Sequence, residues 1–105
     1  MLHICGRSRH LLKDIPETGS SAISIDNHIP MEEAVSTVPN HILVFGNYPA
    51  ANLIFENPST IKTNVVKMLT PVKHQKNVVS STGCDIPSKA SIENIKTFIR
   101  ASKNI

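Results

Sequence analysis

The apolar residues of this chain gather in four short runs, and each run is followed by turn residues and a helical pattern. The runs are LHIC (2–5), AISI (22–25), HILVF (41–45) and NVVSS (77–81). They lack the strict polar–apolar alternation of a half-exposed strand, and such runs are typical of a parallel sheet that is covered by helices. We therefore predict four parallel strands.

Helices are predicted after each strand. The predicted helices cover residues 9–15, 30–38, 57–69 and 91–101. The first should end before Pro16, which cannot continue a helix. The third begins with Asn57 as a cap and Pro58 at its first position, and Ser91 caps the fourth. The residues of the fourth helix that should face the core are Ile92, Ile95, Phe98 and Ile99.

Alternating strands and helices favour right-handed βα crossovers. Four βα units in 105 residues correspond to half of a (β/α)8 TIM barrel or to a small open α/β sheet. A chain of this length is one domain at most, so we predict a single domain over residues 1–105.

Composition and charge exclude several classes of function. The net charge of +3 is mild and the basic residues are scattered, and with one Tyr and no Trp the chain has little to stack on bases, so we expect no nucleic-acid partner. No apolar stretch approaches the ~20 residues that span a bilayer, and no secretory signal is present. We therefore expect a cytoplasmic protein in which Cys5 and Cys84 stay reduced.

The residues with the most distinctive chemistry fall at the carboxyl ends of the predicted strands, where working residues collect in parallel α/β folds. His3 and Cys5 would point to the same face of one strand, and Cys84 follows another strand. Imidazole and thiolate suit zinc, and three protein ligands leave the open position that a catalytic site needs. The alternatives are two buried thiols beside a hydrogen-bonded histidine, or a disulfide.

The zinc hypothesis carries a geometric condition. In a flat sheet the first and fourth strands lie ~14 Å apart, given a spacing of about 4.8 Å. Only a curled sheet with inward-leaning loops would let Cys84 approach His3 and Cys5. The metal site therefore implies barrel curvature.

Two further strand-end residues are weaker candidates for substrate binding. Asp26 could orient a ligand or cap the next turn, and Asn47 could point into a pocket or make an Asx-turn. The spacing of these residues does not decide between the alternatives.

Several blocks of the chain resemble a known family. LHICGRSRHLL, AISIDN, VFGNYPAANLIF, NPSTIKTNVVKML and SSTGCDIPSKASIENIKTFI are together similar to the C-terminal half of the uroporphyrinogen decarboxylase superfamily. The resemblance implies a (β/α)8 barrel of which this chain supplies about four C-terminal βα units, a half-barrel. The decarboxylase branch typically has a GHG block after its final strand, whereas this chain has TGCDIP.

The cysteine version resembles the cobamide-dependent methyltransferases that methylate thiols such as coenzyme M. That resemblance implies zinc at His3, Cys5 and Cys84, a thiol substrate, and a methylated corrinoid carried by a separate protein. Without the other half of the barrel, we expect the chain to be inactive alone. Two alternatives remain: a fragment of a uroporphyrinogen decarboxylase, the enzyme of porphyrin biosynthesis, or a non-enzymatic half-barrel that pairs with another chain or with itself.

Overall fold

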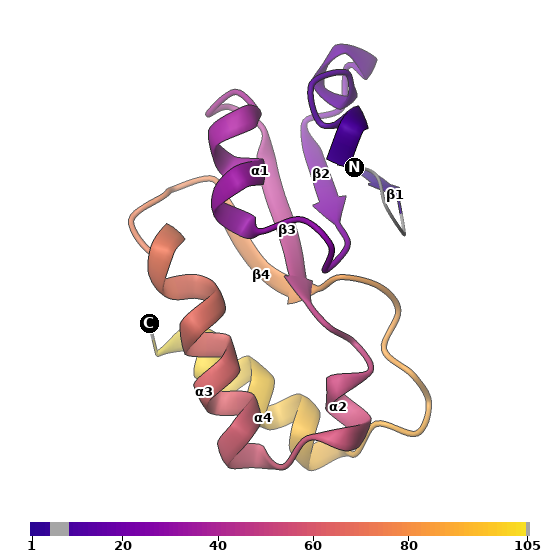
Figure 1. Cartoon of the computed structure of the whole chain (residues 1–105), viewed down its shortest axis with the longest axis vertical. Coiled ribbons are helices and arrows are strands. Elements are labelled where there is room, and N and C mark those ends of the chain that lie inside the picture. Colours follow the sequence, from indigo (N-terminus) through magenta and orange to yellow (C-terminus); the bar gives the residue numbers. More distant parts are fainter. Residues whose placement is uncertain (5–8, 105) are drawn as a thin grey trace.

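The computed structural model describes residues 1–4 and 9–104, and these residues form one four-stranded parallel sheet with helices packed on it (Figure 1). The strands are β1 (Leu2–Ile4), β2 (Ala22–Ile25), β3 (Leu43–Tyr48) and β4 (Val78–Thr82). Each strand pairs in parallel with the next one along the chain, in the order β1-β2-β3-β4. The predicted α/β alternation is confirmed.

The third strand lies further along the chain than predicted. It extends to Tyr48, because residues 46–48 continue to pair with residues 80–82 of β4. Gly46 therefore lies inside the strand and not in a turn after it. A Cβ atom there would lie 2.8 Å from Ile25 Cγ1, so the glycine leaves room for the neighbouring strand.

The helices follow the strands, with one exception. They are α1 (Met31–Thr37), α2 (Asn52–Phe55), α3 (Pro58–Leu69) and α4 (Ile92–Lys103). The predicted helix over residues 9–15 is wrong: this stretch holds the 3₁₀ turn η1 (Arg9–Leu11), and Pro16 lies inside a second turn, η2 (Ile15–Thr18). A short segment in front of a proline gains too few hydrogen bonds to sustain an α-helix.

Helix α3 forms as its sequence predicts. The Asn57 side chain accepts a hydrogen bond from the backbone N of Thr60 at 2.9 Å, and Pro58 occupies the first turn. Ile61 and Val65 are fully buried along its inner stripe. After the helix, the chain continues into a third 3₁₀ turn, η3 (Thr70–Val72).

Helix α4 packs against α3, and the predicted inward face is confirmed only in part: Phe98 is buried and Ile95 packs against the core. Its Ser91 cap is confirmed, since Oγ accepts from the backbone N of Asn94 at 3.1 Å. Ile92 and Ile99, which were expected to face inward, are 67% and 45% exposed. The cause is Asn94, whose buried amide donates to the carbonyls of Leu53 and Glu56 at 2.8 and 3.0 Å and turns that edge of α4 toward α2.

The hydrophobic core lies between the sheet and the helices. It joins Ile23, Ile25 and Val44 of the strands to α1, α3 and α4 through one continuous cluster of buried side chains. Within residues 1–4 and 9–104, no helix has the length and apolar character needed to cross a membrane.

Candidate metal centre

The first part of the candidate site is a contact between the two strands at one edge of the sheet. His3 of β1 is paired in register with Ser24 of β2. The His3 Nδ1 atom lies 3.1 Å from the Ser24 carbonyl oxygen and 2.9 Å from the Ser24 Oγ atom. A carbonyl oxygen can only accept, so Nδ1 carries the proton, and in the neutral imidazole the lone pair is on Nε2.

The second part lies just after β4, at the other edge of the sheet. Gly83 donates its backbone N–H to the Tyr48 carbonyl at 2.8 Å, which extends the pairing with β3 by one residue. The Thr82 hydroxyl then donates to the Cys84 carbonyl at 2.7 Å and closes a tight turn. These bonds hold the half-buried Cys84 at the end of its strand.

The two parts meet in one groove of about 470 Å³, which we call the His3–Cys84 groove. Its lining combines side chains of β1, β2 and β4 with the loop after β4. The lining residues are Met1, His3, Ser24, Ser81, Thr82, Cys84, Asp85 and Ile86. Two of the three predicted metal ligands therefore share a cavity, although they come from the first and the last strand of the sheet.

The close approach of the strand ends explains how these residues meet. A Cβ atom on Gly83 would lie 2.8 Å from the backbone N of Asn27 and 3.1 Å from Asp26 Oδ1. Strands two places apart in a flat sheet would be roughly 10 Å apart. The loop after β4 therefore leans across the end of β3 onto the loop after β2, as the curvature condition of the metal hypothesis requires.

Asp26 and Asn47 lie deeper than the groove. Asp26 Oδ1 accepts from the backbone N of Asn27 at 2.7 Å, which caps the turn after β2. The Asn47 amide donates to the Asp26 carbonyl at 2.9 Å and also to the Ile29 carbonyl. Both side chains are buried, so the contacts that the structure shows hold the loop between β2 and α1. Asn47 also borders a separate cavity of about 230 Å³ beside α1.

The metal ligand set can be traced only in part. Cys5 lies outside the described residues, and among residues 1–4 and 9–104 no three His, Cys, Asp or Glu side chains are grouped closely enough to hold an ion. The residues that are described nevertheless fit zinc in kind. A thiol and an imidazole line one groove, and the imidazole uses Nδ1 on a carbonyl, as metal-binding histidines commonly do.

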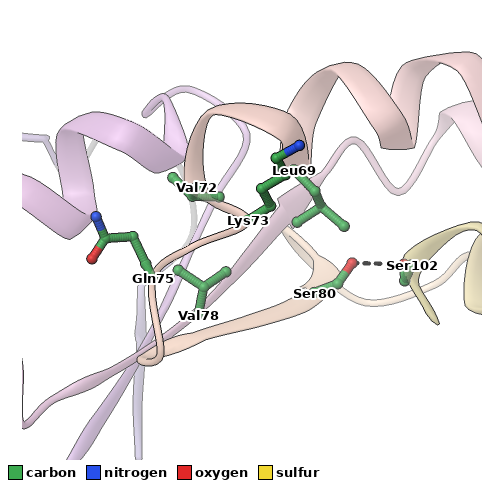
Figure 2. Close-up of a pocket in the computed structure, with 7 residues that line it drawn as sticks. All are labelled: Leu69, Val72, Lys73, Gln75, Val78, Ser80 and Ser102. Atoms are coloured by element: carbon green, nitrogen blue, oxygen red, sulfur yellow. Dashed lines mark hydrogen bonds between the residues drawn. The ribbon is translucent and has the colours of Figure 1, made fainter. Parts of the chain in front are cut away.

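Another cavity lies on the side of β4 that faces the helices, and its lining differs from that of the groove. It has a volume of about 140 Å³ and lies between the end of α3, the start of β4 and α4 (Figure 2). Ser80 and Ser102 share a hydrogen bond of 2.8 Å across it, and Lys73 and Gln75 line its rim. Among the residues that the structure describes, no histidine, cysteine or carboxylate lines this cavity.

Tyr48 is a titratable group whose environment is altered by burial. It is 1% exposed and its ring packs against Phe98 at a centroid distance of 5.4 Å. Burial raises the pKa of the Tyr48 hydroxyl above its ordinary value of 10.0, although the amides of Asn64 and Asn52 oppose the shift. The hydroxyl makes no hydrogen bond of standard geometry with another described residue, and because its pKa is raised it is protonated at neutral pH.

Four parallel strands in sequential order, with a histidine and a cysteine at their open face, define a segment of a barrel-type α/β protein. The whole chain, residues 1–105, matches the uroporphyrinogen decarboxylase (URO-D) family model, so this protein belongs to that family. A solved methyltransferase from Methanosarcina mazei, a TIM-barrel protein, has the same fold over this segment. The TM-score is 0.83 at 21% sequence identity, and the match covers 97% of this chain and 30% of that structure.

Relatives of two activities have similar sequences. The methylcobamide:CoM methyltransferase MtbA of Methanosarcina mazei is 29% identical over 104 residues, which are 99% of this chain and 30% of the relative. A uroporphyrinogen decarboxylase of Prochlorococcus marinus subsp. pastoris is 30% identical over 105 residues, which are 100% of this chain and 30% of the relative. The chain thus spans about 30% of the length of these relatives.

Sequence reasoning did not single out Ser24, Ser81 or Thr82, which also line the groove. A signal for Ser24 was nevertheless present. It is the polar position within the apolar run AISI, and it lies on the face opposite to Ile23 and Ile25. Its pairing with His3 depends on strand register, which the sequence alone does not specify.

Proposed function

We propose that this chain is part of a zinc-dependent methyltransferase that moves a methyl group from a methylated corrinoid to a thiol such as coenzyme M. The observation that carries the proposal is the presence of His3 and Cys84 in one groove, although they lie on the first strand and after the last. Cys5, two residues after His3, would complete a ligand set of one imidazole and two thiolates. The activity printed for the relative MtbA agrees with this chemistry.

The residues of this chain would hold the ion and shape the groove. His3 would bind through Nε2, because Nδ1 is used on the Ser24 carbonyl, and Cys84 would bind as the thiolate. When bound, zinc would supply an open position for the substrate thiol and favour its deprotonated, nucleophilic form. Thiolate ligands require reduced cysteines, which is consistent with a cytoplasmic location.

The partners of the complete reaction lie beyond this chain. The methylated corrinoid would arrive on a separate protein, and the chain spans about 30% of the relatives that carry out whole reactions. We therefore expect little or no methyl transfer from these 105 residues alone. Asp26 and Asn47 stay as weaker candidates for substrate contact; both are buried and bonded to the loop after β2.

Metal analysis tests the site directly. Purified protein should carry stoichiometric zinc, and Cys84→Ser should weaken zinc binding by more than the ~10–100-fold that loss of an outer-shell partner produces. The control is Asp85→Asn, which alters a groove residue outside the proposed ligand set and should leave the zinc content unchanged. Equal and negligible zinc in the wild type and in Cys84→Ser would refute the site.

Uroporphyrinogen decarboxylation is the second candidate function, because decarboxylases match the chain as well as MtbA does. The TGCDIP block at residues 82–87, where the decarboxylase branch typically has GHG, favours the methyltransferase. The two are separated by assaying uroporphyrinogen turnover beside methyl transfer from methylcobalamin to coenzyme M. Turnover of uroporphyrinogen without methyl transfer would reverse our choice.

A non-enzymatic half-barrel that pairs with another chain or with itself is the third candidate. It is supported by the open face of the sheet, where Leu43 is 41% exposed although it lies in a strand. Size-exclusion chromatography decides this point, because a folded, stable monomer would show that no complementary half is needed.

A further inference from the structure

The His3 imidazole lies at an exposed edge of the sheet, where little packing fixes the orientation of its ring. His3 lies in the middle of β1, a strand of three residues, and its side chain is exposed. In the described sheet β1 pairs with β2 alone. A side chain in such a place loses rotamer freedom when it binds a metal, and that loss weakens binding unless another group already holds the ring.

Ser24 supplies two contacts to the same ring nitrogen. Its carbonyl oxygen lies 3.1 Å and its Oγ 2.9 Å from His3 Nδ1. The carbonyl selects the tautomer, because it accepts a hydrogen bond from Nδ1–H and leaves the lone pair on Nε2. The hydroxyl oxygen lies close enough to accept from the same Nδ1–H. Two acceptors then share this hydrogen, and together they restrict rotation of the ring more than the carbonyl alone would.

We propose that Ser24 is a positioning residue for the metal centre, and that its hydroxyl holds the His3 imidazole in the orientation in which Nε2 can bind zinc. This inference rests on the proposed function, because it assigns a supporting role to a residue beside a proposed ligand. It goes beyond that function, since it gives Ser24 a role other than that of a metal ligand. Outer-shell partners of this kind change metal affinity by about 10–100-fold.

Substitution of Ser24 tests the proposal. Ser24→Ala removes the hydroxyl and keeps the carbonyl contact, so zinc affinity measured by competition with a chromogenic chelator should fall by about tenfold. Ser24→Thr keeps a hydroxyl in a residue that suits strands and should restore most of the affinity. The matched control is Ser80→Ala, which removes the bond to Ser102 on the opposite face of the sheet (Figure 2) and should leave the affinity unchanged.

A second readout follows the ring itself in metal-free protein. Long-range ¹H–¹⁵N NMR of His3 should show the Nδ1–H tautomer in the wild type and in both alanine variants, because the Ser24 carbonyl is retained. Relaxation of the ring nitrogens should show a more mobile imidazole in Ser24→Ala and an unchanged one in Ser80→Ala. Thermal midpoints of the two alanine variants should agree, which separates positioning from a general loss of stability.

The outcomes separate the two proposals. If the wild type binds zinc and Ser24→Ala binds it equally well with unchanged ring mobility, the positioning role is wrong and the zinc site stands. If the wild type binds no zinc, the proposed function fails and the positioning role fails with it. If Ser24→Thr is as weak as Ser24→Ala, the hydroxyl is not the group responsible.

Discussion

The two faces of the sheet use neighbouring residues in opposite ways. On the helix side, Ile23 and Val44 are fully buried in a continuous apolar cluster. Ser24, the residue after Ile23, points to the other side of the sheet, where it lines an open groove together with its pairing partner His3. Because successive side chains of a strand point to opposite faces, one stretch of sequence supplies both the packing and the chemistry. The comparison teaches that stability and the candidate site can be altered separately in this chain.

The largest expected effect comes from the packed face. Ile23→Ala should destabilise the protein by about 2–5 kcal/mol, because it leaves a cavity in a site that has no exposure to solvent. Leu43→Ala, on the open face and 41% exposed, should change stability by less than about 1 kcal/mol. Urea denaturation measures both, and equal losses would show that the two faces are not energetically distinct.

An intermediate effect is expected at Gly83, where the loop after β4 approaches the loop after β2. A Cβ atom there would lie 2.8 Å from a backbone nitrogen, which cannot move aside as a side chain can. Gly83→Ala should therefore cost about 1–3 kcal/mol of stability and widen the approach between the ends of β2 and β4. Zinc affinity should fall as well, since Cys84 is the next residue. Unchanged stability and unchanged zinc binding would contradict the close approach.

The smallest effect is expected at Tyr48. Tyr48→Phe removes a buried hydroxyl that has no partner among the described residues, so stability at pH 7 should change by less than about 1 kcal/mol. The difference should appear at high pH. Burial raises the pKa of this hydroxyl in the folded state, so its favourable contribution is complete below about pH 10 and is lost as the pH rises further.

Alkaline unfolding should therefore be less steep in Tyr48→Phe than in the wild type, as followed by circular dichroism between about pH 9 and 12. Identical alkaline limbs would mean that another group controls unfolding in that range.

How far the sequence predicts the fold is best seen by comparing α3 with α4. For α3, the cap at Asn57 and the place of Pro58 in the first turn were correctly identified, because each depends on local spacing alone. For α4, Phe98 was correctly placed but Ile92 and Ile99 were not, because the amide of Asn94 finds its acceptors in α2 and at the end of that helix. That short helix has too few residues to leave a periodic signal, so local patterns could not show the contact.

The candidate site divides in the same way. The chemical types of His3, Cys5 and Cys84, and the places of His3 in a strand and Cys84 after one, could be read from the sequence. The approach of His3 and Cys84 across the sheet could be stated only as a condition, because curvature arises from contacts such as that of Gly83 with Asn27. The role of Ser24 depends on the register of β1 against β2, which the sequence does not encode locally.

The His3–Cys84 groove also has a consequence for folding kinetics. Its two sides come from opposite ends of the chain, so it can close only after the intervening strands and helices have been brought together. Contacts of such long sequence separation form late and slow the folding of a domain. Helical signal should thus return early in a refolding experiment, and competence to bind a metal should return with the last phase.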